Sequence, residues 1–341
     1  MVSKYHKRRL VDRRVLFQLV FVVAGSCGLT TCLFKTGHHV RMGELEIIFS
    51  QDFENTTPGP YGPGEWARDW NDPGWNNGVK KHCTIVERDG TRAMRSYTPA
   101  GEWGLLGHDQ DTMGGGFNWW APVPGRRHDE LYMSYNIYFR PGVEFPISGK
   151  LPGLIGGPQG MDPGRAPEPG EGFTAYMAFY GAADPRGTLA FYCYHPDQHG
   201  DYGDLLVWTD PYNQDEPYFV VKENDMEEKW INLTIRVVLN SPEEKDGLLE
   251  GFVDGRLMYT KQGLRLRTIP SVHIDKCRMS WFYGGSGDDF SPRAEEWILI
   301  DDVTLFTYAS DADVPHGNQP SPAGRKLDLP WMKDTTSGKF P

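Results

Sequence analysis

The sequence lacks the short motifs that mark several common classes of protein. It has no phosphate-cradling glycine loop, no dinucleotide fingerprint, no Gly-x-Ser-x-Gly turn around a nucleophile and no Cys/His spacing of a zinc site. It also has no internal repeat, no heptad pattern and no convincing amphipathic helix. Its net charge of −11 is opposite to the basic excess of nucleic-acid-binding proteins. We therefore expect no nucleotide cofactor, no metal in the chemistry and no nucleic-acid partner.

Cysteine is scarce, with five residues among 341. Cys27 and Cys32 lie in a hydrophobic N-terminal segment, and Cys83, Cys193 and Cys277 lie beyond it. The odd count beyond that segment allows at most one intrachain bridge, for which Cys83 and Cys277 are the candidate pair. Disulfides therefore do not define the fold.

The N-terminal region has the pattern of a membrane-targeting segment. Residues 1–14 carry six Lys and Arg side chains, and residues 15–34 form a run whose only strongly polar side chain is Gln18. That run is long enough to span a bilayer, and its basic flank should stay cytosolic. We expect a signal anchor and a single-pass type II membrane protein facing the lumen or exterior. A cleaved signal peptide, and hence a secreted protein, is the alternative, because residues 24–26 are small.

The rest of the chain has the composition of a β-protein. Residues 45–309 are enough for one domain with a sizeable core, and residues 310–341 form a polar, Pro-rich tail that we expect to be disordered. The chain contains 40 Gly, 26 Pro, 17 Phe, 16 Tyr and 11 Trp, which suits short strands joined by turns. The stretches with strand patterns include 131–139, 231–237, 248–253, 279–283 and 298–306. Because several alternate apolar and polar residues, they favour an all-β fold, a jelly-roll sandwich of two antiparallel sheets.

One predicted hairpin, formed by residues 173–180 and 189–194, groups tyrosines on one face. Its apolar residues share one parity, which leaves Thr174, Tyr176, Tyr192 and Tyr194 on the other face. If the turn centres on Asp184, Tyr176 lies opposite Tyr192 and Thr174 opposite Tyr194. Aromatic faces stack on sugar rings, while phenols and amides bond sugar hydroxyls, so this face suits a carbohydrate. Exposed tyrosines that merely reflect β-propensity are the alternative interpretation.

Residues 149–157 combine a single lysine, Lys150, with four glycines and a proline. Glycine costs about 1 kcal/mol and proline about 3 kcal/mol in a helix interior, so this segment should be extended. We interpret its glycines as allowing close approach of the backbone to a ligand, with Lys150 as the charge presented there.

Other candidate binding residues lie on polar strand faces or in a glycine-rich loop. Asn136 belongs to the polar parity of residues 131–139, and His108 and Gln110 precede a Gly-Gly-Gly-Phe-Asn-Trp-Trp run. A histidine can act as base, acid or carboxylate donor near neutral pH, and a glutamine as a neutral donor. Trp119 and Trp120 are either stacking platforms or core residues.

Four short motifs, in this order along the chain, resemble polysaccharide lyase family fourteen, which comprises alginate lyases of molluscs, algal viruses and fungi and related glucuronan lyases. The motifs are Gly149-Lys150-Leu151-Pro152-Gly153-Leu154 with Gly156-Gly157, Tyr192-x-Tyr194, Trp281-Phe282-Tyr283-Gly284-Gly285-Ser286, and Ile300-Asp301-Asp302-Val303. The similarity runs from about residue 96 to residue 306. It implies a jelly roll whose concave sheet binds a uronic-acid polymer and cleaves it by β-elimination.

The resemblance also implies roles for individual residues. Lys150 matches the family's lysine, and Tyr192 and Tyr194 match its Tyr-x-Tyr pair; these three are the predicted catalytic residues. The family's Ser-x-Arg pair falls on Thr174 and Tyr176, so a hydroxyl is kept but the arginine is not. Because a guanidinium is a natural carboxylate partner, this departure puts alginate itself in question as the substrate.

β-Elimination makes three chemical demands. The uronate carboxylate must be neutralised, a base must take the C5 proton, and an acid must protonate the departing O4. Lys150 can supply the charge, and the two tyrosines can act as base and acid, in roles that the sequence does not separate. Thr174 and Tyr176 would orient the substrate, with His108, Gln110 and Asn136 as further substrate-binding candidates.

Two minor sites are expected from the polar residues. Asp52 and Glu54 could meet Asp301 and Asp302 and hold a structural Ca²⁺, although ordinary solvated carboxylates are the alternative. Asn55 and Asn232 begin glycosylation acceptor tripeptides, which would make the chain a glycoprotein.

The sequence thus predicts a polysaccharide lyase acting on a uronic-acid polymer of the alginate, glucuronan or glycosaminoglycan type. The alternative from another class is a non-catalytic carbohydrate-binding protein. A glycosidase is less favoured, because hydrolysis needs two acids on one strand face and the predicted strands offer tyrosines.

Overall fold

The computed structural model describes residues 45–73, 75–104, 114–125, 127–158, 164–181, 187–209, 226–285, 287–308, 320–321 and 325–333. All of them belong to one compact unit, residues 40–341. The predicted segments 1–14 and 15–34 lie outside the described residues. Within the described ranges, no helix is long and apolar enough to cross a membrane.

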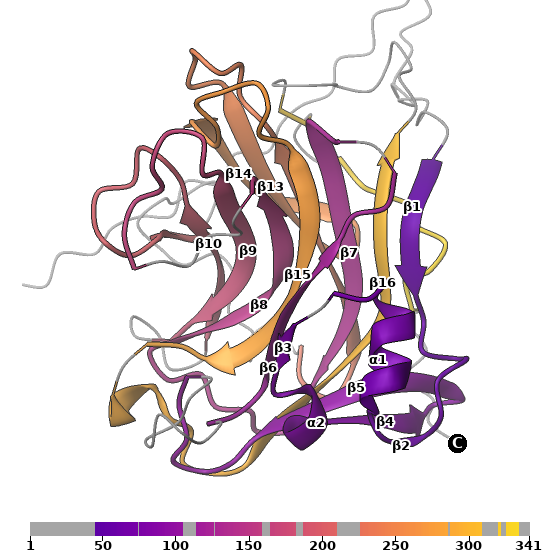
Figure 1. Cartoon of the computed structure of the whole chain (residues 1–341). Helices are drawn as coiled ribbons and strands as arrows, with labels where there is room; N and C mark the ends of the chain where they lie inside the picture. Colours follow the sequence, from indigo (N-terminus) through magenta and orange to yellow (C-terminus); the bar gives the residue numbers. More distant parts are fainter. Residues whose placement is uncertain are drawn as a thin grey trace, which may run out of the picture. The chain divides into compact units, whose positions relative to one another are not determined.

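Two sheets make up most of the described structure (Figure 1). The first has nine strands, with β1 paired to β16 beside the main path. Its main path runs in the order β14 (Arg256–Leu264), β13 (Gly247–Val253), β12 (Trp230–Val238), β7 (Glu130–Phe139), β16 (Glu296–Tyr308), β5 (Thr91–Thr98), β4 (Cys83–Arg88) and β2 (Gly59–Pro60), and β1 is Leu45–Gln51.

The second sheet has seven strands, and all pairs of named strands in both sheets are antiparallel. Its order is β11 (Asp204–Val207), β10 (Thr188–Tyr194), β9 (Phe173–Tyr180), β8 (Ser148–Gly156), β15 (Ile274–Tyr283), β6 (Phe117–Pro122) and β3 (Asn76–Asn77). The described helices are α1 (Pro63–Asp69), α2 (Val79–His82) and the 3₁₀ turn Asp288–Phe290.

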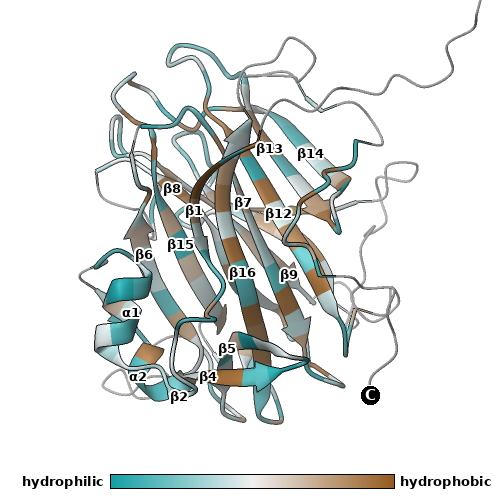
Figure 2. Cartoon of the chain, turned by 90° about the vertical axis from the view of Figure 1, so that its right-hand side faces the viewer, coloured by the Kyte–Doolittle hydropathy of each residue, from teal (hydrophilic) through white to brown (hydrophobic). Residues whose placement is uncertain are grey.

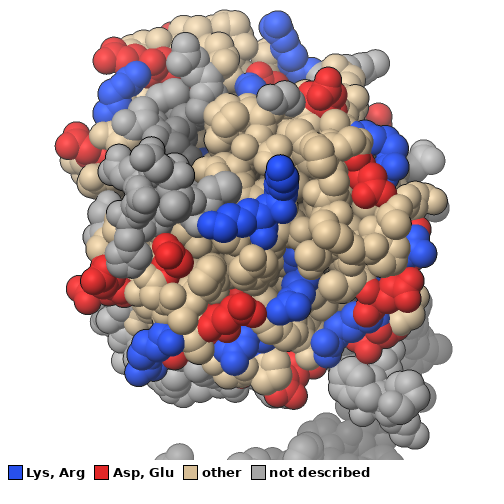
Figure 3. Space-filling model, turned by 60° about the horizontal axis from the view of Figure 1, so that its bottom comes forward, with Lys and Arg blue, Asp and Glu red and all other residues tan. Residues whose placement is uncertain are grey.

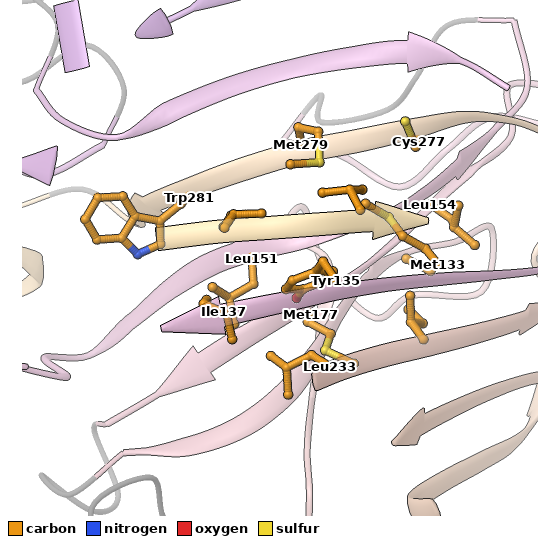
Figure 4. Close-up of a cluster of buried hydrophobic side chains, with 14 of the residues drawn as sticks. Met133, Tyr135, Ile137, Leu151, Leu154, Met177, Leu233, Cys277, Met279 and Trp281 are labelled. Carbon is orange, nitrogen blue, oxygen red and sulfur yellow. The ribbon is translucent and has the colours of Figure 1, made fainter. Parts of the chain in front are cut away.

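The core lies between the two sheets. Figure 4 shows Met133 and Ile137 of β7 among Leu151 and Leu154 of β8 and Met177 of β9, and all five belong to one buried apolar cluster. Alternate residues of a strand point to opposite faces, so the odd residues of β7 and β9 enter this core. Figure 2 shows the corresponding bands of hydrophobic and hydrophilic residues along the strands. The predicted all-β jelly-roll sandwich of two antiparallel sheets is confirmed.

The outer face of the nine-stranded sheet is covered by the C-terminal segment. Leu327 and Leu329 pack on Phe252 and Phe306 in a second buried cluster, and Trp331 packs against it. The predicted disorder of the tail is therefore wrong for residues 325–333. Their apolar side chains, which alternate with polar ones, find an apolar patch on β13 and β16.

Three sequence-based expectations are corrected here. Cys83, Cys193 and Cys277 are free and buried, so the expected bridge between Cys83 and Cys277 is wrong. Asn232 is 2% exposed, and its Nδ2 donates to Ser134 Oγ at 2.9 Å, so it is not an accessible glycosylation acceptor. Asn55, the other acceptor, is exposed.

Asn136 is the third correction, because it is not near the predicted binding face. It lies on β7 in the nine-stranded sheet, fully buried, and its Nδ2 donates to Asp302 Oδ2 at 2.7 Å and to the carbonyl of Trp331 at 2.9 Å. The polar parity of β7 was predicted correctly, but this polar face bonds the chain's own C-terminal segment.

Candidate active site

Strands β9 and β10 bring the predicted tyrosines together on the outer face of the seven-stranded sheet, which is the face turned away from the core. Tyr176 pairs with Tyr192, and Thr174 with Tyr194, so the predicted hairpin register is confirmed. The ring centroids of Tyr176 and Tyr192 are 5.7 Å apart, and those of Tyr192 and Tyr194 are 5.6 Å apart. The hydroxyl of Thr174 accepts from the backbone N–H of Tyr194 at 3.4 Å, which ties the two strands together beside the rings.

Lys150 on β8 reaches the same group of rings. Its Nζ lies 3.5 Å from the centroid of the Tyr192 ring, and the residue is only 8% exposed. An ammonium over a phenol face is a cation–π contact, which is stronger where water is excluded. The structure thus gathers Lys150, Tyr192 and Tyr194, the three residues predicted to be catalytic.

A β-bulge decides which residues of β8 face these rings. Lys150 pairs with Ala178 and Gly153 with Tyr176, so three steps along β8 match two steps along β9. Pro152 lies inside the bulge, where its missing N–H takes no bond from the ladder. The extra residue brings Lys150 and Gly153 to the same face although they are three positions apart.

Glycines make room for this arrangement. A Cβ on Gly153 would lie 2.2 Å from Cα of Tyr176, and a Cβ on Gly284 would lie 3.4 Å from Cε of Lys150. The glycines of residues 149–157 were interpreted as admitting a ligand. Gly153 instead admits the neighbouring strand and its tyrosine, which corrects that interpretation.

Sequence analysis missed a second buried cation on this face. Arg278 on β15 is 2% exposed, and its Cζ lies 4.8 Å from the centroid of the Tyr176 ring. Its Nε donates to Asn118 Oδ1 at 2.9 Å. The period-two pattern could have found it, because Arg278 has the parity opposite to the core residues Cys277 and Met279. The predicted strand began at residue 279, five residues after the observed start of β15 (Ile274–Tyr283), and so left Arg278 out.

An aromatic pair lies at the far edge of the same face. Trp120 on β6 is the Cα partner of Arg278, and its ring centroid is 5.0 Å from that of Trp75. Trp75 is 42% exposed, whereas Trp119 is fully buried in the core. Trp119 is therefore a core residue, whereas Trp120 lies on the other side of the sheet, where its role as a stacking platform stays a prediction.

His108 and Gln110 lie outside the described residues, so their predicted roles stay predictions.

The two acidic segments that were expected to hold calcium do meet. Thr91 Oγ1 donates to Glu54 Oε1 at 2.7 Å and to Asp301 Oδ2 at 3.0 Å. The positive charge found there is Lys333, whose Nζ is 2.7 Å from Asp301 Oδ2 and 3.6 Å from Asp302 Oδ2. In the described part of the chain, no three His, Cys, Asp or Glu side chains are arranged to hold a metal. Calcium therefore stays a sequence-based prediction.

Charge elsewhere is mixed. Figure 3 shows Lys and Arg side chains interspersed with Asp and Glu on one face of the molecule. With a net charge of −11, attraction of a polyanion needs a local cationic site. Lys150 and Arg278 provide one, buried beside phenols that can bond sugar hydroxyls. The fold and this cluster of cations and phenols define a β-sandwich protein with a candidate site for an acidic carbohydrate.

The family follows from comparison with known sequences. The profile of Polysaccharide lyase 14 matches residues 86–303, so the chain belongs to this family and is a polysaccharide lyase. Among curated proteins, none matches the chain in sequence.

Solved structures share the fold. Alginate lyase Aly36B superposes with a TM-score of 0.59 at 20% identity, covering 75% of this chain and 95% of that one. The PL-14 alginate lyase from Aplysia kurodai gives 0.58 at 20% identity, covering 76% and 98%. Alginate lyase vAL-1 from Chlorella virus gives 0.55 at 17% identity, covering 69% and 91%.

Proposed function

We propose that the chain cleaves a uronic-acid polysaccharide by β-elimination, with Lys150, Tyr192 and Tyr194 as the catalytic residues. The observation that carries the proposal is the 3.5 Å contact between the Lys150 ammonium and the Tyr192 ring. Lys150 can neutralise a carboxylate and Tyr192 can transfer a proton, and the contact places the two together on a sheet face suited to sugars.

The elimination can be written with this chain's own side chains. Lys150 lies beside the uronate carboxylate and stabilises the enolate-like charge that develops when the C5 proton leaves. One tyrosine, as phenolate, takes that proton, and the electron pair forms the C4–C5 double bond while the C4–O4 bond breaks. A phenol returns a proton to the departing O4. Cleavage therefore produces one new chain end with an unsaturated uronate and one with a free 4-hydroxyl. Lys150 contacts the ring of Tyr192, which places this phenol beside the charge that the elimination needs.

Thr174 and Tyr176 are proposed to orient the sugar. Thr174 is fully buried and fixed to the backbone of Tyr194, and Tyr176 packs on Tyr192. A change at either would move the catalytic phenols as well as the substrate.

An acidic polysaccharide is the proposed substrate class. Structures of Aly36B variants contain an alginate trisaccharide and an alginate tetrasaccharide. In this chain two buried cations on one sheet face support a polymer that carries carboxylates. A non-catalytic lectin role is not favoured, because the family is one of lyases and the lysine and both tyrosines are in place.

We also propose that the N-terminal segment directs the lyase domain to the lumen or exterior, as an anchored type II protein or a secreted one. The support is the hydrophobic run of residues 15–34 behind a basic flank, together with the exposed acceptor Asn55. Expression in a secretory host, with protease protection and glycosidase digestion, tests this; a cytosolic chain would contradict it.

The proposed reaction is tested by incubating the full chain with alginate, glucuronan, hyaluronan, chondroitin and heparosan. We expect the ultraviolet absorbance of a 4,5-unsaturated uronate to appear with at least one polymer and to be lost in Lys150→Ala. Release of saturated sugars alone would indicate hydrolysis, and binding without product would indicate a lectin; either result contradicts the proposal.

A further inference from the structure

Arg278 is a charged side chain that the proposed chemistry does not use. It is 2% exposed, yet it lies on the outer face of the seven-stranded sheet. A guanidinium removed from water costs several kcal/mol unless its surroundings compensate. Its Nε donates to Asn118 Oδ1, and its guanidinium lies across the ring face of Tyr176. Its orientation is thus fixed by protein groups on two sides.

The register explains how Arg278 reaches a tyrosine two strands away. Arg278 pairs with Gly153, and Gly153 pairs with Tyr176, so the three lie in one row across β15, β8 and β9. Gly153 has no side chain, and the guanidinium can therefore cross β8 to the ring. Any larger residue at position 153 would clash with Tyr176, because its Cβ would lie 2.3 Å from Cβ of Tyr176.

The same row continues into the catalytic group. Tyr176 pairs with Tyr192, whose ring carries the ammonium of Lys150 on its face. The two buried cations, Lys150 and Arg278, thus each lie on one ring of a packed tyrosine pair. A planar guanidinium held at Nε and on one face is oriented to meet a planar anion, and it binds carboxylates with paired N–H groups.

We propose that Arg278 binds a carboxylate of the acidic polysaccharide, next to the sugar unit whose carboxylate Lys150 neutralises. This inference rests on the proposed function, and it names Arg278 as a residue that determines the substrate specificity of the candidate active site. Position 176, where the family resemblance predicts an arginine, holds a tyrosine. The guanidinium comes instead from β15 and lies on that tyrosine. The site therefore recognises free carboxylates through two cations on different strands.

The test compares Arg278→Met and Arg278→Lys with the full wild-type chain. The ligands are a uronate oligosaccharide of the polymer that the chain cleaves, or of the polymer that it binds most tightly if none is cleaved, and the same oligosaccharide with its carboxylates methyl-esterified. Lys276→Met is the matched control, because it removes a cation from the same strand, where Lys276 Nζ bonds the carbonyl of Gly157 and Asp275. Binding affinities and KM are measured, with melting temperatures to verify folding.

We expect Arg278→Met to weaken binding of the free acid at least about 10-fold, the range for a lost hydrogen bond to a charged group. Binding of the methyl ester should change little, so the variant should lose most of the wild-type preference for the free acid over the methyl ester. Arg278→Lys should recover part of that preference, and Lys276→Met should keep it. An equal loss on both substrates, or an unchanged preference in a folded Arg278→Met, would overturn the proposal.

Failure of the proposed function looks different. If the wild-type chain yields no unsaturated product but prefers the free acid in binding, and Arg278→Met removes that preference, the chemistry is wrong and the binding role of Arg278 holds. If product forms and the Arg278 variants leave the preference intact, only the role of Arg278 is wrong.

Discussion

Lys150 on β8 and Tyr192 on β10 meet across the strand between them, because the residue of β9 opposite Lys150 is Ala178. The next residue in that row, on β10, is Ala190, which is equally small. A lysine side chain can therefore lie over the sheet to the ring of Tyr192. Two alanines that carry no chemistry of their own thus help to assemble the site.

The catalytic assignment predicts a loss of turnover rather than of folding. Tyr192→Phe keeps the ring under the ammonium but removes the proton-transfer group, so kcat should fall about 100-fold to 10,000-fold. Lys150→Ala should lower kcat comparably. Initial rates of unsaturated-product formation measure both. Tyr202→Phe is the control, because Tyr202 is 72% exposed. Wild-type kcat in a folded Tyr192→Phe would remove Tyr192 from the mechanism.

The two site glycines should respond differently to alanine. In Gly153→Ala the added Cβ would lie 2.2 Å from backbone of Tyr176, and such overpacking costs typically about 1–3 kcal/mol of stability. In Gly284→Ala the Cβ would lie 3.3 Å from Phe282 Cε2 and 3.4 Å from Lys150 Cε. Both are side-chain atoms that can shift slightly, so stability should change little while the displaced lysine lowers activity. Gly200→Ala, with nothing within 4 Å, is the control for both. Denaturant unfolding and initial rates separate the effects; a fully stable Gly153→Ala would contradict the packing argument.

Sugar stacking on the edge tryptophans predicts an effect on affinity. Trp120 pairs with Arg278 and packs on Trp75, so Trp120→Ala should raise KM for polymer several-fold and leave kcat for a short oligosaccharide nearly unchanged. The matched control is Trp297→Ala, since Trp297 stacks on Tyr138 in the other sheet. Equal KM changes in the two variants would indicate a general effect of losing a tryptophan.

Two buried carboxyls predict how stability depends on pH. Burial raises the pKa of Asp301 and of Glu296 to about 7. A raised pKa means that the folded state binds the proton more tightly than the unfolded chain. The free energy of unfolding should therefore rise as the pH falls from about 8 towards the ordinary carboxyl range near about 4.

The measurement is the unfolding free energy of the wild type and of Asp301→Asn across this pH range. The variant should lose part of the slope between pH 7 and 4, because one titrating group is gone, and its Lys333 partner loses an anion. A wild-type stability that instead falls throughout this range would show that other groups dominate.

The C-terminal segment predicts a stability effect that is remote from the site. Trp331 packs on Phe306 with centroids 5.3 Å apart, and its Nε1 donates to Ser134 Oγ at 3.1 Å. Trp331→Ala, or removal of residues 325–341, should lower the melting temperature while KM stays near wild type in the folded fraction. Thermal unfolding and steady-state kinetics test this. An unchanged melting temperature would mean that the segment adds nothing to stability.

Much of the fold could be predicted because period-two alternation is a local property of the sequence. The hairpin register of Tyr176 and Tyr192 followed from parity and a turn position. Parity says which residues share a face, but it does not say which sheet a strand joins. For that reason Asn136 was assigned to a binding face, whereas β7 lies in the opposite sheet under the C-terminal segment.

The part of the site that sequence reasoning missed depends on contacts between distant strands. Arg278 meets Tyr176 only because β15 lies two strands from β9 and Gly153 stands between them. Likewise, the burial of Asn232 depends on Ser134, which is 98 residues away in the chain. No local pattern contains either relationship.

The bulge in β8 also shapes the spacing across the site. Between the row of Lys150 and the row of Arg278, β9 advances two residues (178 to 176), β8 three (150 to 153) and β15 four (282 to 278). Each step from β9 to β8 to β15 therefore adds one residue between the row of Lys150 and the row of Arg278. Inserting or deleting a single residue in any one of these strands would re-aim one cation relative to the other, and with it the pattern of negative charge that the enzyme can recognise.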